Sequence, residues 1–299
     1  MIAITGSTGF IGTQIYSSIE LPKKCLVRQR NPALPFQEQL IGDLLNSSDR
    51  EAFVKDSDTL LHLAWVNNPW TSNDNVVSDV TQNLLSSIAL FESFAKSNPG
   101  GHIIFSSSGG NMYKQNSSIP HRESDLPAPW TSYSINKLAA ENYLKLFCKK
   151  YGIRATVLRI SNPYGILLPS HRSNGLIGVV FSKLLKNETL NIIDSLHSVR
   201  DYIHLNDLAR AIQLVIQSPP KKGHVDIYNV STGHGSTLKE ILDLVEAITK
   251  RKISTHFVNA DCEPSYSILS AELIQKKLGW LPKICLEEGL NKMWMSINT

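Results

Sequence analysis

Tyr133 and Lys137, two residues that could move a proton, lie four positions apart in the stretch SYSINKLAAENY. Four residues make about one helical turn, so both side chains would share a face, where a lysine ammonium could stabilise a tyrosinate. A phenol ionises at about pH 10 and becomes a useful acid or base near neutrality only if a cation lowers its pKa. A surface lysine one turn from a packed tyrosine would give the same pattern.

Glycines near the start of the chain strengthen the chemical interpretation. Gly6, Gly9 and Gly12 follow the strand-like run 2–5 and open a helical pattern. Their missing side chains permit a tight turn and let the backbone approach a pyrophosphate at the positive end of a helix. A purely structural turn is the alternative. Between the glycines and the tyrosine lies a serine cluster, Ser106, Ser107 and Ser108.

The end of the second expected strand bears on which dinucleotide is bound. An acidic residue there would bind the ribose hydroxyls of NAD, whereas an arginine would accommodate the extra phosphate of NADP. The segment reads KCLVRQR, with Arg28 about where the acid belongs and Arg30 just beyond. NADP is therefore expected, and NAD is the alternative if both arginines are solvated strand-end charges.

Composition and charge exclude several classes of protein. The 299 residues are 42% hydrophobic and 19% charged, as expected of a soluble globular protein with one or two domains. The formal charge of +4 is too small and dispersed to favour nucleic acid or a membrane surface as a partner. We find no apolar stretch of the roughly 20 residues that a membrane helix needs, and no secretion signal, so a cytoplasmic protein is expected.

The four cysteines are widely separated, at Cys25, Cys148, Cys262 and Cys285. They form no CxxC pair, so the sequence indicates neither a zinc site nor a disulfide framework. We therefore expect no metal and reduced thiols.

Short apolar runs alternate with helical patterns through the first half of the chain. Further strands are expected at 25–27, 59–64, 103–106 and 155–160, and crossover helices at 83–95 and 133–151. Strands separated by helices indicate a parallel sheet covered on both faces, which is an α/β fold of the doubly wound Rossmann type.

The alternation ends after Pro163. An apolar helix is expected at 176–185, and a later helix behind the possible cap Ser236 or Thr237. We expect a dinucleotide-binding domain over residues 1–165, with a return segment near 198–218, and a smaller mixed α/β substrate domain mainly over 166–299. The second domain should lie over the carboxyl ends of the strands, where doubly wound folds bind ligands.

Several short motifs occur in a characteristic order. They are GSTGFIG at 6–12, GDL at 42–44, LLHLAW at 60–65, FSSSGG at 105–110, YSINK at 133–137, LRISNPYG at 158–165, RDYIHLNDLA at 200–209 and LGW at 278–280. With these motifs the chain resembles, over nearly its whole length, the extended short-chain dehydrogenase/reductases of the nucleotide-sugar epimerase/dehydratase family.

The resemblance implies roles for the matching residues. Tyr133 would transfer the proton, Lys137 would bind the nicotinamide ribose and lower the tyrosine's pKa, and Ser108 would hydrogen-bond the reacting sugar oxygen. Ser107 is the alternative serine, because the stretch GGNMY shifts the register. Cofactor contacts are expected from Gly6, Thr8, Gly9, Phe10, Ile11, Gly12, Arg28, Arg30, Asp43, Leu44, Leu63, Ala64, Trp65, Asn83, Ser106, Tyr133 and Lys137.

Substrate contacts are expected from Ser107, Ser108, Asn162 and Arg200. The family often carries a further diphosphate-binding arginine where this chain has Ala260 and Asp261, and Arg172 is expected to replace it. The implied substrate is a nucleotide-diphosphate sugar, and the implied assembly is a homodimer.

The resemblance implies a nucleotide-sugar 4-epimerase acting through bound NAD or NADP. A close alternative is an NADPH-dependent reductase of a nucleotide-linked 4-keto sugar, which Arg28 favours. A regulator that binds the cofactor without turnover is a third hypothesis, against which the intact serine, tyrosine and lysine argue. Dehydration is disfavoured, because Gly109 and Gly110 stand where dehydratases place an acidic pair.

Overall fold

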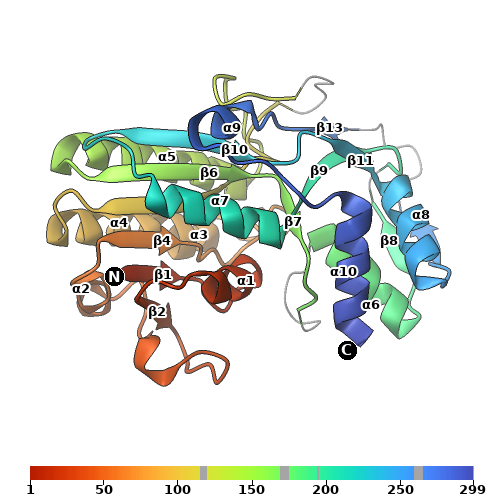
Figure 1. Cartoon of the computed structure of the whole chain (residues 1–299), viewed down its shortest axis with the longest axis horizontal. Coiled ribbons are helices and arrows are strands. Elements are labelled where there is room, and N and C mark those ends of the chain that lie inside the picture. Colours follow the sequence, from red (N-terminus) through yellow and green to blue (C-terminus); the bar gives the residue numbers. More distant parts are fainter. Residues whose placement is uncertain (115–119, 169–174, 194, 259–264, 299) are drawn as a thin grey trace.

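A seven-stranded parallel sheet forms the centre of the protein in the computed structural model, which describes residues 1–114, 120–168, 175–193, 195–258 and 265–298 (Figure 1). In spatial order its strands are β10 (Val225–Val230), β6 (Arg154–Ile160), β5 (His102–Ser108), β4 (Thr59–His62), β1 (Ile2–Thr5), β2 (Lys23–Val27) and β3 (Gln39–Ile41). The chain winds outward in both directions from β1 and β4, so the predicted Rossmann fold is confirmed.

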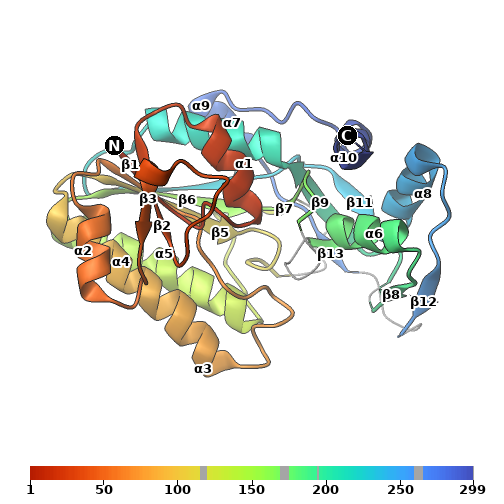
Figure 2. The same ribbon diagram turned by 90° about the horizontal axis from the view of Figure 1, so that it is seen from below.

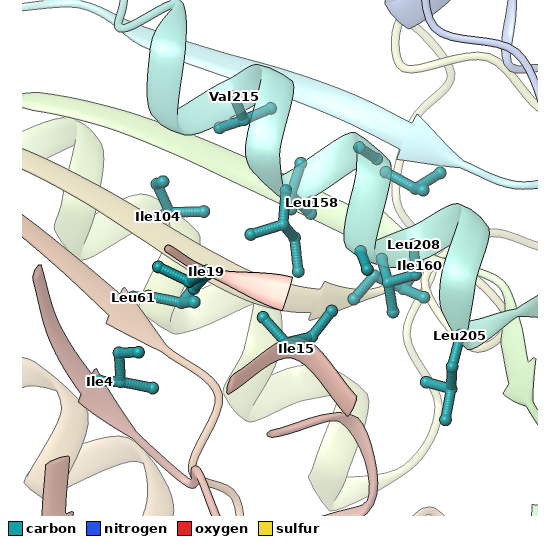
Figure 3. Packing of buried hydrophobic residues seen from close by; sticks show 14 of the residues in the cluster. Ile4, Ile15, Ile19, Leu61, Ile104, Leu158, Ile160, Leu205, Leu208 and Val215 are labelled. Atoms are coloured by element: carbon teal, nitrogen blue, oxygen red, sulfur yellow. The ribbon is translucent and has the colours of Figure 1, made fainter. Parts of the chain in front are cut away.

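Helices cover both faces of this sheet, which Figure 2 shows nearly edge-on. One layer holds α1 (Phe10–Ser18), α7 (Leu205–Gln217) and α9 (Glu272–Leu278); the other holds α2 (Ser47–Val54), α4 (Ser86–Ser97) and α5 (Ser132–Tyr151). Figure 3 shows the core under the first layer, where Ile4, Leu61 and Ile160 of the strands form one cluster with Ile15 and Leu208 of the helices. The strands are buried on both faces, which explains their continuous apolar runs.

The helix before the serine-bearing strand β5 is irregular. A short helix, α3 (Val76–Asp79), continues through the π-helical turn Val80–Leu85 into α4. Such π turns inside helices occur frequently at functional sites. Here the turn carries Asn83, one of the predicted cofactor residues.

A smaller part of the chain lies beside the carboxyl ends of the main strands (Figure 1). It contains a sheet of β7 (Asn162–Tyr164), β9 (Val199–His204), β11 (Gly235–Thr237) and β13 (Tyr266–Ser267), and the pair β8 (Leu190–Ile192) with β12 (Thr255–Phe257). Its helices are α6 (Gly175–Lys186), α8 (Leu238–Thr249) and α10 (Leu286–Asn298), which pack around a core of their own. In the larger part, a 3-10 turn, Phe36–Glu38, precedes the edge strand β3.

The chain crosses between these two parts more than once. After β9 it returns to the main sheet through α7 and β10, the region of the predicted return segment near 198–218. It leaves again for β11 and α8, whose N-terminus is capped by Thr237, one of the two predicted caps. The division at residue 165 remains a prediction.

Three observations on the described residues bear on function classes. None of their helices combines the length and the apolar character that crossing a membrane requires. Within the same part of the chain, Cys25, Cys148 and Cys285 are unpaired thiols. Nor do the described histidines, cysteines and acidic residues gather into a group able to hold a metal ion.

Candidate active site

A cleft of about 1250 Å³ opens at the carboxyl ends of the main strands. Its walls come from the loops after β1, β2, β3 and β4, from the end of β5, from α5, and from β7 and α6 of the smaller part. The volume exceeds the range of about 300–1,000 Å³ typical of small-molecule sites, so it can hold a dinucleotide together with a second ligand. Of the predicted site residues that the structure describes, the cleft lining includes all except Arg200.

The glycine loop supplies a backbone surface that no other residue type would leave open. Gly6 has φ +72°, and a Cβ there would lie 2.6 Å from the backbone nitrogen of Ala64. A Cβ on Gly12 would lie 1.9 Å from the carbonyl oxygen of Gly6. The following helix α1 begins at Phe10 with Gly9 as its N-cap and no side-chain cap, so its first amides face the cleft uncapped by a side chain. This arrangement suits a pyrophosphate.

The loop after β2 places both predicted arginines on the cleft. Arg28 and Arg30 line it, and the guanidinium carbon of Arg30 lies 3.5 Å from the ring centroid of Phe36. Gln39 fixes this loop by exchanging hydrogen bonds with the backbone of Asn31. The loop therefore presents two cations where an acid would otherwise bind ribose hydroxyls.

Helix α5 holds the tyrosine and lysine at its first turns. Thr131 caps the helix through a reciprocal capping box with Ser134, and Gly152 ends it with φ +70°. The loop before α3 satisfies two more N-terminal amides: Ser72 accepts from the Tyr133 backbone at 3.1 Å, and Asn73 accepts from Ser132 at 2.9 Å. These bonds fix where Tyr133 enters the cleft.

The side chain of Lys137 is almost fully buried. Its ammonium donates to the carbonyl oxygen of Ser106 at 2.6 Å and lies 3.7 Å above the ring centroid of Trp65. It is 5.6 Å from the ring centroid of Tyr133. Burial lowers the pKa of Lys137 well below its usual value, while the negative charges of Glu141 and Asp79 raise it.

The acidity of Tyr133 corrects one expectation. Burial raises its pKa to about 12, an interaction with the Ser108 hydroxyl lowers it, and the charge of Asp79 raises it. The expected lowering by Lys137 is not observed in the protein alone. Burial disfavours the charged forms of both groups, and the ammonium is turned toward Trp65 and Ser106.

The three serines of β5 have different partners. Ser108 is the serine whose hydroxyl interacts with Tyr133. Ser107 donates to a buried Glu141 carboxylate oxygen at 2.6 Å, and Ser106 donates to the carbonyl oxygen of His62 at 3.1 Å. The geometry therefore favours Ser108 over Ser107 as the serine that would act together with the tyrosine.

A buried carboxylate that the sequence analysis missed organises the base of the site. Asp79 is fully buried and accepts four side-chain hydrogen bonds of 2.7–3.0 Å. The donors are Asn67, Asn83, Ser132 and Asn136. Asp79 thus ties α3 and the preceding loop to α5, directly beside Tyr133 and Lys137. Only the spacing of Ser132 and Asn136, one helical turn apart, could have indicated a shared partner.

A second missed pair lies behind the serines. Glu141 and Arg159 form a buried ion pair, with Arg159 Nε 3.2 Å and Nη2 2.7 Å from the two carboxylate oxygens. Arg159 also donates to the Tyr113 hydroxyl at 2.8 Å, which donates to Asn229 at 2.9 Å. The network joins α5, β5, β6 and β10 under the site. Its members are far apart in the sequence, so no local pattern indicates that they pair.

The remaining predicted residues lie as follows. Asn162 lines the cleft and donates to the carbonyl oxygen of Asp201 at 2.8 Å. Arg200 donates to both the carbonyl and the hydroxyl of Ser265, away from the lining. Arg172, Ala260 and Asp261 are outside the described residues.

His62 is a packed residue of β4. Its ring nitrogens lie 2.7 Å from the Thr5 hydroxyl and 2.8 Å from the Ser87 hydroxyl. Burial lowers its pKa to about 3, so the ring is neutral at physiological pH.

The arrangement of glycine loop, serine, tyrosine and lysine agrees with the comparison to known families. The sequence model of the NAD dependent epimerase/dehydratase family matches residues 2–231. The chain belongs to this family. A family relative, the dTDP-4-dehydro-6-deoxyglucose reductase of Escherichia coli, is 29% identical, with 99% of this chain and 97% of the relative covered.

Solved structures of the family share the fold. The UDP-glucose 4-epimerase of Thermotoga maritima, solved with UDP-glucose, has a TM-score of 0.89 and 27% identity, with 99% of this chain and 98% of that chain covered. The Thermus thermophilus UDP-glucose 4-epimerase, solved with NAD, has a TM-score of 0.88 and 25% identity at the same coverage. The protein uses NAD or NADP, and its glycine cradle and cleft fit such a dinucleotide.

Proposed function

We propose that the protein is an NADPH-dependent reductase of a nucleotide-linked 4-keto sugar. The second candidate is a nucleotide-sugar 4-epimerase. Both reactions move a hydride at sugar C4 and use the same catalytic groups. The observation that carries the choice is the pair Arg28 and Arg30, both on the cleft at the end of β2. This order reverses the ranking that the sequence alone gives.

In the reduction, the side chains of the cleft have distinct tasks. Bound NADPH would supply the hydride. Tyr133, which holds its proton at neutral pH, donates it to the ketone oxygen as that oxygen gains charge. Ser108 orients the same oxygen by a hydrogen bond, and Lys137 contributes a positive charge beside the tyrosine.

Whether the enzyme consumes or retains its cofactor connects the arginines to the reaction. A reductase uses up its reduced cofactor in every turnover and exchanges it freely, commonly as NADPH. An epimerase recovers its cofactor and gains by retaining it, since loss in mid-cycle would strand the ketone. Two guanidinium groups can hold the additional phosphate of NADP through charge-assisted hydrogen bonds. The full-length likeness to a dTDP-4-keto sugar reductase supports the same interpretation.

The epimerase remains the second candidate because of a specific likeness. Two solved structures that match the whole chain at 25% and 27% identity are those of UDP-glucose 4-epimerases. In this reaction Tyr133 would act first as its tyrosinate, accepting the proton of the C4 hydroxyl, and would later return that proton.

The deciding experiment is to incubate the protein with dTDP- and UDP-linked sugars and 4-keto sugars, with NADPH, NADH or neither. Stoichiometric NADPH oxidation by a keto sugar supports the reductase. Product isomers without net cofactor consumption would overturn it in favour of the epimerase.

A variant tests the role of the arginines in the same assay. Replacing Arg28 and Arg30 by Ala should raise KM for NADPH by about 10–100-fold, the loss expected for a charged hydrogen bond, and leave KM for NADH unchanged. The matched control is Arg122→Ala, an exposed arginine outside the cleft lining. Equal effects on both cofactors would argue against 2′-phosphate recognition.

We further propose a cytoplasmic homodimer. The described face of α3, the π turn and α5 exposes Val77, Leu85, Ile135 and Leu146, each at least half exposed. Such a stripe is typical of a helix-to-helix interface. Free thiols suit a reducing compartment. Sedimentation should give a dimer for the protein and a monomer for Leu146→Asp; a monomeric wild-type protein contradicts the assembly.

Substrate binding by Arg200 and Arg172 also stays a proposal. The guanidinium of Arg200 is bonded to Ser265, beside the segment 259–264 that lies outside the described residues. If either arginine binds the substrate diphosphate, replacing that arginine by Ala should raise KM for the sugar nucleotide without changing KM for the cofactor.

A further inference from the structure

Trp65, which follows β4, is a lining residue of the cleft that contacts both Lys137 and Tyr133, on which the chemistry depends. The Lys137 ammonium lies 3.7 Å above its ring centroid, well inside the distance at which a cation is attracted to an indole face. The Tyr133 ring meets the indole edge-on at 6.0 Å and 79°.

Lys137 lacks a carboxylate partner of its own among the described residues. The acidic groups around it are engaged elsewhere: Glu141 of α5 pairs with Arg159 of β6, and Asp79 of α3 accepts four hydrogen bonds. His62 of β4 is neutral. The ammonium's one described hydrogen bond runs to the Ser106 carbonyl. The indole face therefore occupies the place where a counter-charge would be expected.

We propose that Trp65 is a positioning residue for Lys137, whose indole face holds the buried ammonium in its charged form and directs it beside Tyr133. The contact offsets part of the desolvation that burial imposes on the ammonium. Electrostatic attraction to an aromatic face is strongest for Trp, weaker for Phe and absent for Leu. A graded series at this position therefore changes the cation contact step by step. The proposal rests on the proposed function only where turnover is measured.

The test is the titration of Lys137 itself, which needs no turnover. The Cε resonance of Lys137 is followed with pH by NMR in protein labelled with ¹³C-lysine, and Lys137→Met assigns it. Trp65→Leu should lower the pKa of Lys137 by about one pH unit, the equivalent of one desolvated cation–π contact. Trp65→Phe should lower it by about half as much. The control is Trp70→Leu, since Trp70 lies in the same loop, is 68% exposed and is outside the cleft lining.

Turnover provides the second readout. The high-pH limb of kcat against pH, where Lys137 loses its proton, should move to lower pH in the same order, Trp, Phe, Leu, with the Trp70 control unchanged. An unchanged lysine titration in folded Trp65→Leu would overturn the proposal, even if activity falls. Should Trp65→Leu fail to fold by near-UV circular dichroism, Trp65→Phe decides alone: a pKa equal to that of the wild type refutes the proposal. A shifted titration in a protein that turns over no sugar nucleotide supports the contact and refutes only the proposed function.

Discussion

Removing the charge of Glu141 should destabilise the whole protein, because its partner cannot reach water. Both side chains are at most 3% exposed, and the carboxylate is bonded to Arg159 at 2.7 and 3.2 Å and to Ser107 at 2.6 Å. Glu141→Gln keeps the shape and one acceptor but leaves the guanidinium without a counter-charge. We expect the free energy of unfolding to fall by about 3–5 kcal/mol, the cost of breaking a buried pair from one side.

A double variant separates the ion pair from simple packing. Glu141→Leu combined with Arg159→Met removes both charges of the pair, so it should recover much of the loss seen with Glu141→Gln. The control pair is exposed: Asp243→Asn breaks a contact with Lys239 on α8, whose side chains are 55–60% exposed. That change should cost only about 0.3–0.5 kcal/mol.

The assay is urea unfolding followed by circular dichroism and fluorescence at one fixed protein concentration, because any dimer would add to the apparent stability. A typical total of about 5–15 kcal/mol makes the expected loss easy to measure. A fall below about 1 kcal/mol for Glu141→Gln, or a double variant as unstable as the single one, would refute the reasoning.

Three further changes have defined outcomes. Tyr133→Phe should reduce kcat by at least about 100-fold with NADPH binding retained, whereas unaltered biological activity would support the silent regulator. Asp79→Asn places an amide donor among the four side chains that donate to Asp79, so one donor is left without an acceptor. The free energy of unfolding should fall by about 1–3 kcal/mol and kcat should drop. An Asp79→Asn variant with wild-type kcat would contradict the positioning role of Asp79. Burial lowers the pKa of His62 to about 3 and of His102 to about 4, from 6.5 when unfolded, so between these values the unfolded state binds more protons. The contribution of both neutral histidines to the free energy of unfolding should then be complete above pH 6.5 and fall on acidification by about 1.4 kcal/mol per pH unit for each histidine. In His62→Gln, the urea midpoint of unfolding should therefore depend less on pH than in the wild type.

Local patterns determined what depends on neighbours in the chain. Apolar runs and helical periodicity identified the parallel sheet and its crossovers, and the glycines of the loop after β1 marked a turn whose close backbone contacts leave no room for a side chain. The spacing of Tyr133 and Lys137 placed both on one helix, as α5 shows. These features follow from dihedral preferences and periodicity, which a short stretch of sequence contains.

Tertiary structure alone decided how the charges of the site are balanced. The sequence cannot show that Asp79 accepts from Ser132, that Glu141 pairs with Arg159, or that the Lys137 ammonium lies over Trp65, since 18 to 72 residues separate these partners. Nor could spacing show that burial leaves Tyr133 with a pKa of about 12 instead of lowering it. Desolvation depends on every atom packed around a group, and those atoms come from strands and helices that only the folded sheet brings together.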